Sequence, residues 1–375
     1  MINDSIVVSD LLQPRGLVLI NGERAEALLD FTIDNNSFFQ ADTFRMRLAI
    51  SQQPPDRGLD WWAVQENLQM EFFLGFPQDP NFFSPTDLTS FLLGNVDDLE
   101  FDPVADVMSF TGRDLTSKLI DFKRTISFSS GTLVASDIVT KIAKERGLTP
   151  VVVPTQAAAG VYYQIVKALV ESNCTYWDIV TRLAQIERYQ AYVVGNELHF
   201  EPRTSPDADP YVINWQEPVD TNGFPTANAQ QIRFSRNLSI AKDLKVRVLS
   251  YDPKKKTAVN ETAERKRVYN KVTSKSAKSK EPPQEYVYNV PNLTSDQARQ
   301  RAQSILEELS KHEMNLHAEL PGDLLLTPQN IVALQGTGTV FDQTYFASSI
   351  SRAYSYDGAF RMTLDAKNQT PNTPT

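Results

Sequence analysis

The chain has 375 residues and a formal net charge of −9, with 41% hydrophobic and 22% charged residues. This composition excludes a disordered or fibrous protein, and the length favours roughly two to four domains. The acidic balance argues against duplex nucleic acid as a ligand of the outer surface, because phosphate binding needs a basic face. Every apolar run is shorter than the roughly 18 residues that span a bilayer, so we expect no membrane insertion.

The N-terminal segment carries Asp4 where a secretory signal peptide carries basic residues. The single cysteine, Cys174, cannot form an internal disulfide, which fits a reducing compartment. We therefore expect synthesis in the cytoplasm, with Cys174 as a buried small residue.

Residues 1–111 show a strand-like pattern. The segment 16–20 ends at Asn21-Gly22, a strong hairpin signal, and residues 44–50 alternate strictly after Phe44. Such alternation places one strand face on a core and the other against solvent or a partner. Short strands separated by turns predict a small antiparallel barrel or sandwich as the first domain. The further predicted strands are 31–34, 68–75, 92–96 and 107–110.

Residues 112–203 change in character and predict a small α/β module. A helix is expected over 136–147, with Ser136 as N-cap and Gly147 as C-cap. A short strand at 151–153 and a second helix over 175–189 follow. A hairpin then turns at Gly195-Asn196, between strands 191–194 and 197–200.

Residues 204–368 return to strands and predict a second β unit, which contains one helix over 295–311. Residues 369–375 are rich in Asn, Thr and Pro and are predicted to form a disordered tail. The predicted strands of this unit are 231–235, 244–250, 314–320, 331–334, 343–350 and 360–364.

The range 252–280 inside this second unit is a basic insert. It holds eight Lys and two Arg against three acidic residues, a net charge of +7 in an acidic chain. Two readings stay open: a flexible solvated loop, or a basic arm that docks on an acidic neighbouring subunit or faces passing DNA.

The histidines do not form a metal site by their spacing. His312 and His317 flank Glu313 as in a zinc-protease motif, but they are five apart rather than four and leave a helix for a strand. His199 stands alone, and no cysteine pair can supplement a zinc site. The chain also lacks a nucleophile elbow and a phosphate-binding glycine loop. We expect no catalytic residue, no cofactor and no metal.

Two other functions remain as alternatives. A glycan or peptidoglycan hydrolase could use paired acids such as Asp98 and Glu100, although this acidic run is more simply a solvated loop between strands. A receptor- or carbohydrate-binding tail module could use an early aromatic cluster, although aromatic residues of this kind more simply bury a barrel or a subunit interface. The cluster consists of Trp61, Trp62, Phe72, Phe73, Phe82 and Phe83.

Several segments, taken in order, resemble the family of phage tail hub proteins. This family includes late control protein D, baseplate hubs and the hub region of type VI secretion spike proteins. The order and separation of the segments match the family over nearly the whole chain. The segments are 110–121, 135–139, 175–184, 195–200, 320–323, 334–338, 341–342 and 345–347.

The resemblance implies an α+β, mainly β fold: two antiparallel tube-type barrels flanking the α/β module. It implies a homotrimeric ring that adapts a six-fold tail tube protein above to a three-fold central spike below. The expected location is the virion tail baseplate, after synthesis in the host bacterial cytoplasm. Baseplate wedge proteins and tape-measure protein are further partners, and DNA meets the ring only in transit through its lumen. The acidic balance permits lumen walls along which DNA slides.

Three residue roles are predicted beside this resemblance. Gly112 to Asp114 form a corner where a strand leaves the first barrel, and such a corner needs a permissive backbone. Trp177 is a core anchor of the α/β module. Pro321 to Asp323 form a plain turn between strands. No needle or lysozyme-like domain follows the second barrel, so we expect wall piercing and cutting to belong to other chains.

Overall fold

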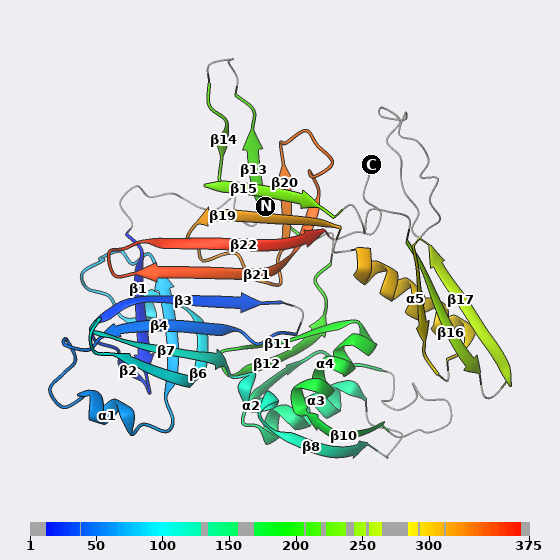
Figure 1. Cartoon of the computed structure of the whole chain (residues 1–375), viewed down its shortest axis with the longest axis horizontal. Coiled ribbons are helices and arrows are strands. Elements are labelled where there is room, and N and C mark those ends of the chain that lie inside the picture. The colour runs from blue at the N-terminus through cyan, green and yellow to red at the C-terminus, as the bar shows by residue number, and fades with distance from the viewer. Residues whose placement is uncertain are drawn as a thin grey trace.

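A computed structural model describes residues 13–37, 39–128, 134–156, 169–205, 208–218, 223–237, 244–252, 255–264, 284–291, 293–310 and 313–368. Its centre is one large sheet with a small α/β module against it and a separate sheet-and-helix unit at one side (Figure 1). The predicted tail 369–375, His312 and residues 265–280 of the basic insert lie outside the described residues. No helix within these ranges is long and apolar enough to cross a membrane.

The first β unit contains seven described strands in the order β3-β4-β7-β6-β5-β1-β2, all antiparallel. The predicted hairpin at Asn21-Gly22 is confirmed, and both residues have positive φ, as a tight hairpin turn needs. A short helix, α1 (Leu59–Ala63), and a 3-10 turn, η2 (Pro85–Asp87), connect the strands. The strands are β1 (Arg15–Ile20), β2 (Glu23–Arg24), β3 (Leu28–Asn36), β4 (Thr43–Ala49), β5 (Gln69–Gly75), β6 (Thr89–Asp102) and β7 (Val107–Asp114).

The second β unit also contains seven described strands, in the order β15-β19-β22-β21-β20-β13-β14. Chain order and sheet order are the same in both units, so β1 corresponds to β13, β3 to β15, β6 to β21 and β7 to β22. One pairing differs, because β13 runs parallel to β20 whereas β1 runs antiparallel to β5. The strands are β13 (Tyr211–Gln216), β14 (Thr226–Ala227), β15 (Gln231–Arg236), β19 (Met314–Pro321), β20 (Ile331–Gln335), β21 (Thr344–Ser355) and β22 (Phe360–Asn368).

The two β units join edge to edge through β3 and β21. These strands pair antiparallel from Asn36 opposite Ser349 to Asp30 opposite Ser355. The cores meet at this junction, since Tyr354 and Phe360 pack with the aromatic core of the first unit. The units therefore share one continuous sheet rather than touching as separate barrels.

The α/β module carries two helices on a three-stranded sheet, β11-β12-β9, beside a two-stranded sheet, β10-β8. The predicted helices and hairpin are confirmed, with Gly147 at positive φ after the first helix. Ser136 is not the N-cap; it lies in the first turn and hydrogen-bonds Thr155. The elements are α2 (Ser117–Ile120), β8 (Lys123–Phe128), α3 (Ala135–Glu145), β9 (Thr149–Val152), β10 (Leu169–Thr175), α4 (Tyr176–Glu187), β11 (Tyr189–Val194) and β12 (Glu197–Pro202).

The range 244–310 forms a sheet and core of its own, which corrects the prediction that strand 244–250 belongs to the second barrel. The sheet order is β17-β16-β18, and the predicted helix, α5, packs on β16 and β17. Part of the predicted loop is thus strand β17, where Val259 and Ala263 face the helix side. The strand was misassigned because the connection between β15 and β19 contains an inserted unit with its own hydrophobic core. The elements are β16 (Leu244–Asp252), β17 (Thr257–Glu264), β18 (Gln284–Asn289) and α5 (Ser295–Ser310).

Candidate functional site

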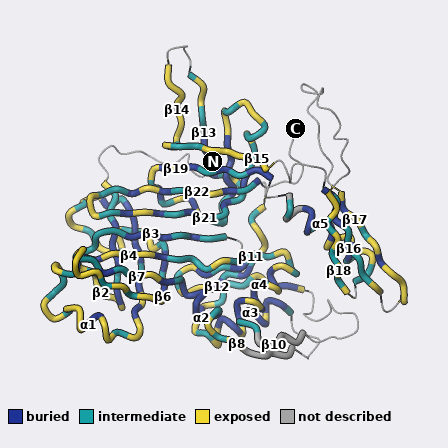
Figure 2. The backbone as a smooth tube through the Cα atoms, in the orientation of Figure 1, coloured by how far each residue is buried: buried dark blue, intermediate teal, exposed yellow. Residues whose placement is uncertain are grey.

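One candidate surface is a polar face that crosses both β units. The strands β6, β7, β4, β3, β21, β22, β19 and β15 lie side by side, and buried and exposed positions alternate along them (Figure 2). Cross-strand partners place polar side chains next to one another across the junction, because side chains one residue apart point to opposite faces. Examples are Arg45 beside Thr32 and Asp34 beside Ser351.

The charges on this face are mixed. Arg47 forms an ion pair with Asp30 on the neighbouring strand, and Arg113 binds Asp97 through two hydrogen bonds of 2.6 and 2.8 Å. Arg113 also reaches Asp121, so it ties the end of β7 to the entry of the α/β module. Acidic and basic groups thus neutralise one another here, and the net acidity of the chain is not concentrated on this face.

A buried arginine holds the junction of the two β units. Arg352 on β21 is 1% exposed, and its guanidinium donates to the side chain of Asn35 on β3 and to the carbonyl of Leu326. The ring of Phe91 lies 4.5 Å from this guanidinium. Burial lowers the pKa of Arg352 to about 10, so the group is still charged at neutral pH. A charge buried at this junction is tolerated because hydrogen bonds and nearby acids compensate it.

Asp42 and Asn35 extend this buried polar cluster into the first unit. The Asp42 carboxylate accepts hydrogen bonds of 2.6 Å from the Asn36 backbone N–H and from the Asn35 amide. Desolvation raises the pKa of Asp42 to about 6, although these hydrogen bonds and Arg352 act in the opposite direction. Burial, and next the charge of Asp42, raise the pKa of Asp114 well above its ordinary value.

Asp323 does more than complete the predicted turn at 321–323. It is 9% exposed, and its carboxylate accepts from the Tyr211 hydroxyl at 2.5 Å and from the backbone N–H groups of Leu325 and Leu326. This fixes the loop after β19, whose Leu326 carbonyl then accepts from Arg352. The role could not be found from the local pattern, because Tyr211 is more than a hundred positions away in the chain.

The α/β module is attached at the same junction. Trp177 is 6% exposed and packs in the module core, which confirms its predicted role as an anchor. Its indole N–H also donates to the carbonyl of Phe39 at 2.8 Å, and Phe39 lies in the loop between β3 and β4. The residue therefore connects the module to the first β unit as well as filling its own core.

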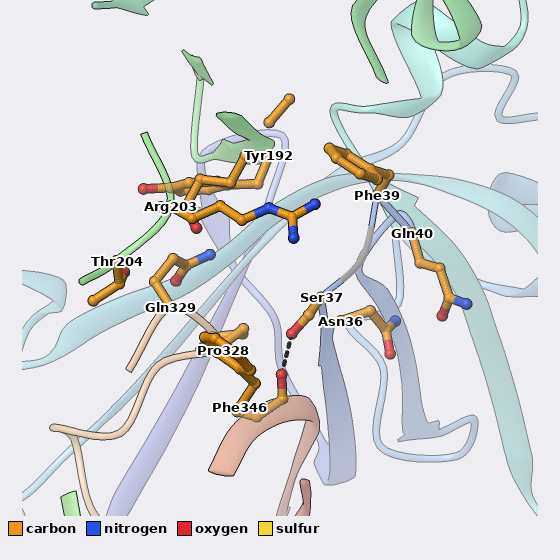
Figure 3. Close-up of a pocket in the computed structure, with 13 residues that line it drawn as sticks. Asn36, Ser37, Phe39, Gln40, Tyr192, Arg203, Thr204, Pro328, Gln329 and Phe346 are labelled. Atoms are coloured by element: carbon orange, nitrogen blue, oxygen red, sulfur yellow. Dashed lines mark hydrogen bonds between the residues drawn. The ribbon is translucent and has the colours of Figure 1, made fainter. Parts of the chain in front are cut away.

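A cleft opens where the two β units and the module meet. Its lining combines amide, hydroxyl and aromatic side chains with one guanidinium. Figure 3 shows Arg203 extending across the cleft towards Ser37 and Phe39, and the Ser37 hydroxyl donates to the Ala347 carbonyl at 2.5 Å. The lining can hydrogen-bond a chain segment, but it offers no nucleophile paired with a base. The labelled lining residues are Asn36, Ser37, Phe39, Gln40, Tyr192, Arg203, Thr204, Pro328, Gln329 and Phe346.

The acids proposed for a hydrolase lie on a strand. The prediction of a loop here is wrong, because β6 runs through to Asp102 and Asp98 and Glu100 are exposed on it. Val96 and Asp98 flank a β-bulge, and Asp97 between them binds Arg113.

Within the described ranges no group of three or more His, Cys, Asp or Glu could hold a metal ion. His199 stacks on Tyr192 and contacts Glu197, while His317 contacts Asp365 at 2.8 Å.

The predicted aromatic cluster divides between core and surface. Trp62, Phe72 and Phe73 are buried in the first unit, while Trp61 meets Trp62 edge to face and Phe83 lies half-buried beside Arg24. The remaining member, Phe82, is 85% exposed. The six residues therefore do not form one binding surface.

Gly112 is required because a larger side chain would not fit, not because the chain turns a corner at this residue. It lies inside β7, opposite Val96 on one side and Phe44 on the other. A Cβ atom at this position would collide with the Asn95 carbonyl oxygen and with the Phe44 ring. The strand continues to Asp114, so the corner predicted at 112–114 comes after these residues.

No protein-family model matches this sequence, and no curated protein matches it. Solved structures match it over almost its whole length. A tail protein from Neisseria meningitidis MC58 aligns at a TM-score of 0.69 with 13% identity, over 97% of this chain and 100% of that one. The 43 kDa tail protein of prophage MuSo2 from Shewanella oneidensis aligns at 0.64 with 13% identity, over 96% and 98%.

A third similar structure is an Escherichia coli component of the type VI secretion system, described as similar to the T4 tail proteins gp27 and gp5. It aligns at a TM-score of 0.53 with 11% identity, over 95% of this chain and 78% of that one. The chain therefore has the mainly β, α+β fold of phage tail and type VI secretion proteins. The α+β, mainly β fold class expected from the resemblance to tail hubs is confirmed.

Proposed function

We propose that the chain is a structural tail hub: a homotrimeric ring at the virion tail baseplate that adapts a six-fold tail tube to a three-fold central spike. The observation that carries this proposal is the duplicated β unit. Two copies of one strand order lie edge to edge in one sheet, so three chains supply six equivalent units. A trimer of such chains has three-fold symmetry at one end and quasi-six-fold symmetry at the other.

The polar face of the shared sheet is the proposed lumen wall. Part of its positive charge is paired within the face, as between Arg47 and Asp30, and acidic side chains alternate with the other arginines, which weakens the hold on phosphate. DNA or tape-measure protein would pass along it without lasting contacts. The mixed charge departs from the acidic wall that we expected from composition, and it serves the same purpose by neutralisation.

The proposed partners follow from the two ends of the ring. A tail tube protein above and a central spike below complete the axis, with wedge and tape-measure proteins as further contacts. Support comes from the fold of the Neisseria and Shewanella tail proteins and of the Escherichia coli secretion component. We further propose that the chain carries no catalytic group and binds no cofactor or metal.

The test is the mass and projection image of the purified full chain. We expect a particle of three 42.2 kDa chains with a central opening. A monomer at every concentration, without rings in the images, would contradict the hub function. Release of soluble fragments from purified peptidoglycan, lost in Glu100→Gln, would instead favour a hydrolase.

A further inference from the structure

Two strand edges at opposite ends of the polar face have no strand partner among the described residues. Beyond Asn95, β6 pairs with β7 alone, because β5 ends its pairing at that residue. At the other end, β15 pairs only with β19. Open edges of this kind expose rows of N–H and C=O groups that another chain can pair with.

The duplicated strand order identifies the partner of each open edge. By position in the sheet, β6 corresponds to β21 and β15 corresponds to β3. In the chain itself β21 and β3 pair antiparallel and join the two units. The same contact between β6 and β15 is missing within one chain, because these strands lie at opposite ends of the face. A second copy of the chain can supply it.

The register of this contact can be read from the two β-bulges. Aligning the bulges places Asp98 of β6 at the position of Ser349 in β21. In the first unit, the residues that pair in turn across β7 and β4 lead from Asp98 to Thr32 on β3. In the second unit, the same steps across β22 and β19 lead from Ser349 to Arg233 on β15, so Arg233 corresponds to Thr32. Transferring the β3–β21 register then sets Glu100 opposite Ser235, Phe101 opposite Phe234 and Asp102 opposite Arg233.

The side chains on the polar side of the two edges have complementary charge. Arg233 is exposed on β15 and has no ion pair within the described part of the chain, and the same holds for Glu100 on β6. In the deduced register Arg233 lies opposite Asp102 and diagonal to Glu100. Opposite charges at such cross-strand positions stabilise a sheet.

The other side of the two edges is apolar. Phe234 is 39% exposed, although its ring packs at a tilt against Phe341, with 4.4 Å between centroids. Phe101 is only partly buried against the core of the first unit. Facing each other, the two rings would extend the aromatic core across the contact, and aromatic cross-strand pairs add to sheet stability.

We propose that β15 of one copy pairs antiparallel with residues 97–102 of β6 in the next copy, head to tail around the ring. The partner is therefore a second copy of this chain. This inference rests on the proposed function, since a closed ring is what a repeated head-to-tail contact produces when the rotation closes. It adds the strands and the register that close the ring.

The test is a disulfide across the deduced register, made in the full chain with Cys174→Ser. Directly opposed residues of an antiparallel pair have Cα atoms about 4.5–5.5 Å apart, which a disulfide can bridge. We expect the double variant Glu100→Cys with Ser235→Cys to give covalent dimers and trimers after mild oxidation, on non-reducing gels. The matched control is Glu100→Cys with Gln231→Cys, on the same sheet face but four residues from the deduced partner, and it should stay monomeric on the gel.

A second control makes the outcomes separable. Asp34 and Ser351 are paired within the chain, so Asp34→Cys with Ser351→Cys should close an intrachain bond without any ring. Trimeric particles in which this control oxidises but the Glu100–Ser235 pair does not would overturn the edge pairing and leave the hub function standing. Equal linking at Gln231 would overturn the register. A wild-type monomer would overturn both proposals together.

Discussion

The two β units share one strand order but fill an equivalent position differently. The bulge alignment matches Arg352 on β21 with Phe101 on β6. Arg352 sits at a junction already made, where it is fully buried and binds Asn35 and the loop carbonyl of Leu326. Phe101 sits at an open edge and is partly exposed. A buried charge is tolerated only where hydrogen-bond partners surround it, as at the completed junction, whereas an apolar side chain needs no such partners.

The units differ equally in the connection between their third and fourth strands. In the first unit this loop is short, and Phe39 and Asp42 in it hold the α/β module and the junction. In the second unit the same connection contains the whole module of β16, β17, β18 and α5. Because a sheet is held by its strands, a loop at this position can grow into a new core without changing the strand order.

The largest expected effect comes from breaking the internal junction. Arg352→Met removes the charge that compensates the buried carboxyl groups and leaves the Leu326 carbonyl without its donor. We expect a loss of about 3–5 kcal/mol in the free energy of unfolding, measured by chemical denaturation. The matched control is Arg361→Met on the exposed side of β22, which should change stability by less than about 0.5 kcal/mol. Equal effects of both variants would contradict the role of Arg352.

A smaller loss is expected inside the first unit. Gly112→Ala places a methyl group against the Asn95 carbonyl on β6 and the Phe44 ring on β4, so these strands must move away from β7. Overpacking of this kind costs about 1–3 kcal/mol, visible as a lower denaturant midpoint. Gly58→Ala has open space around its new Cβ and no positive φ, and it should leave the midpoint unchanged. Wild-type stability in Gly112→Ala would show that the strand contact is not tight.

The buried carboxyl group at the junction predicts a pH dependence. Asp42 has a folded pKa of about 6 against an ordinary 3.8, so the folded protein holds the proton more tightly than the unfolded chain. The proton on Asp42 adds its full share to the free energy of unfolding below about pH 4. This share is lost as pH rises through 6, which lowers the free energy of unfolding by about 1–3 kcal/mol. Asp42→Asn keeps an oxygen for the Asn36 N–H and should remove this part of the pH dependence.

The measurement is denaturant unfolding of both proteins from pH 4 to pH 8. The difference between wild type and Asp42→Asn isolates Asp42 from Asp114 nearby, whose pKa is also raised. Parallel curves for the two proteins would show that Asp42 does not titrate in this range.

The smallest expected effect concerns the open edges. Arg233→Glu places like charges across the proposed contact and should weaken each junction of the ring by about 0.2–1 kcal/mol. The readout is the concentration at which trimers dissociate, followed by sedimentation. Adding Glu100→Arg to the same chain restores opposite charges at the diagonal position and should recover part of the association. Association unaffected by either charge change would argue that these side chains do not meet.

Local pattern in the sequence determined the elements. Alternation of apolar and polar residues marked most strands of both units, and the turn at Asn21-Gly22 marked the hairpin. The predicted start of the second helix at 175 agrees with the structure, where Thr175 is the N-cap of α4. Ser136 misled because its hydroxyl has a partner far along the chain, Thr155, which local spacing does not reveal.

Strand order and the candidate site needed the tertiary structure. The pairing of β3 with β21 joins residues more than three hundred positions apart, and the cluster of Arg352, Asn35 and Asp42 exists only because of that pairing. Periodicity also could not separate residues 244–250 from the second barrel, because a strand has the same alternation in any sheet. The sequence alone thus determined most of the strands and the three longest helices, since their pattern depends on nearest neighbours, although β17 and the second half of β6 were missed. Only the fold decided which edges meet and which stay open, since that depends on contacts between distant segments.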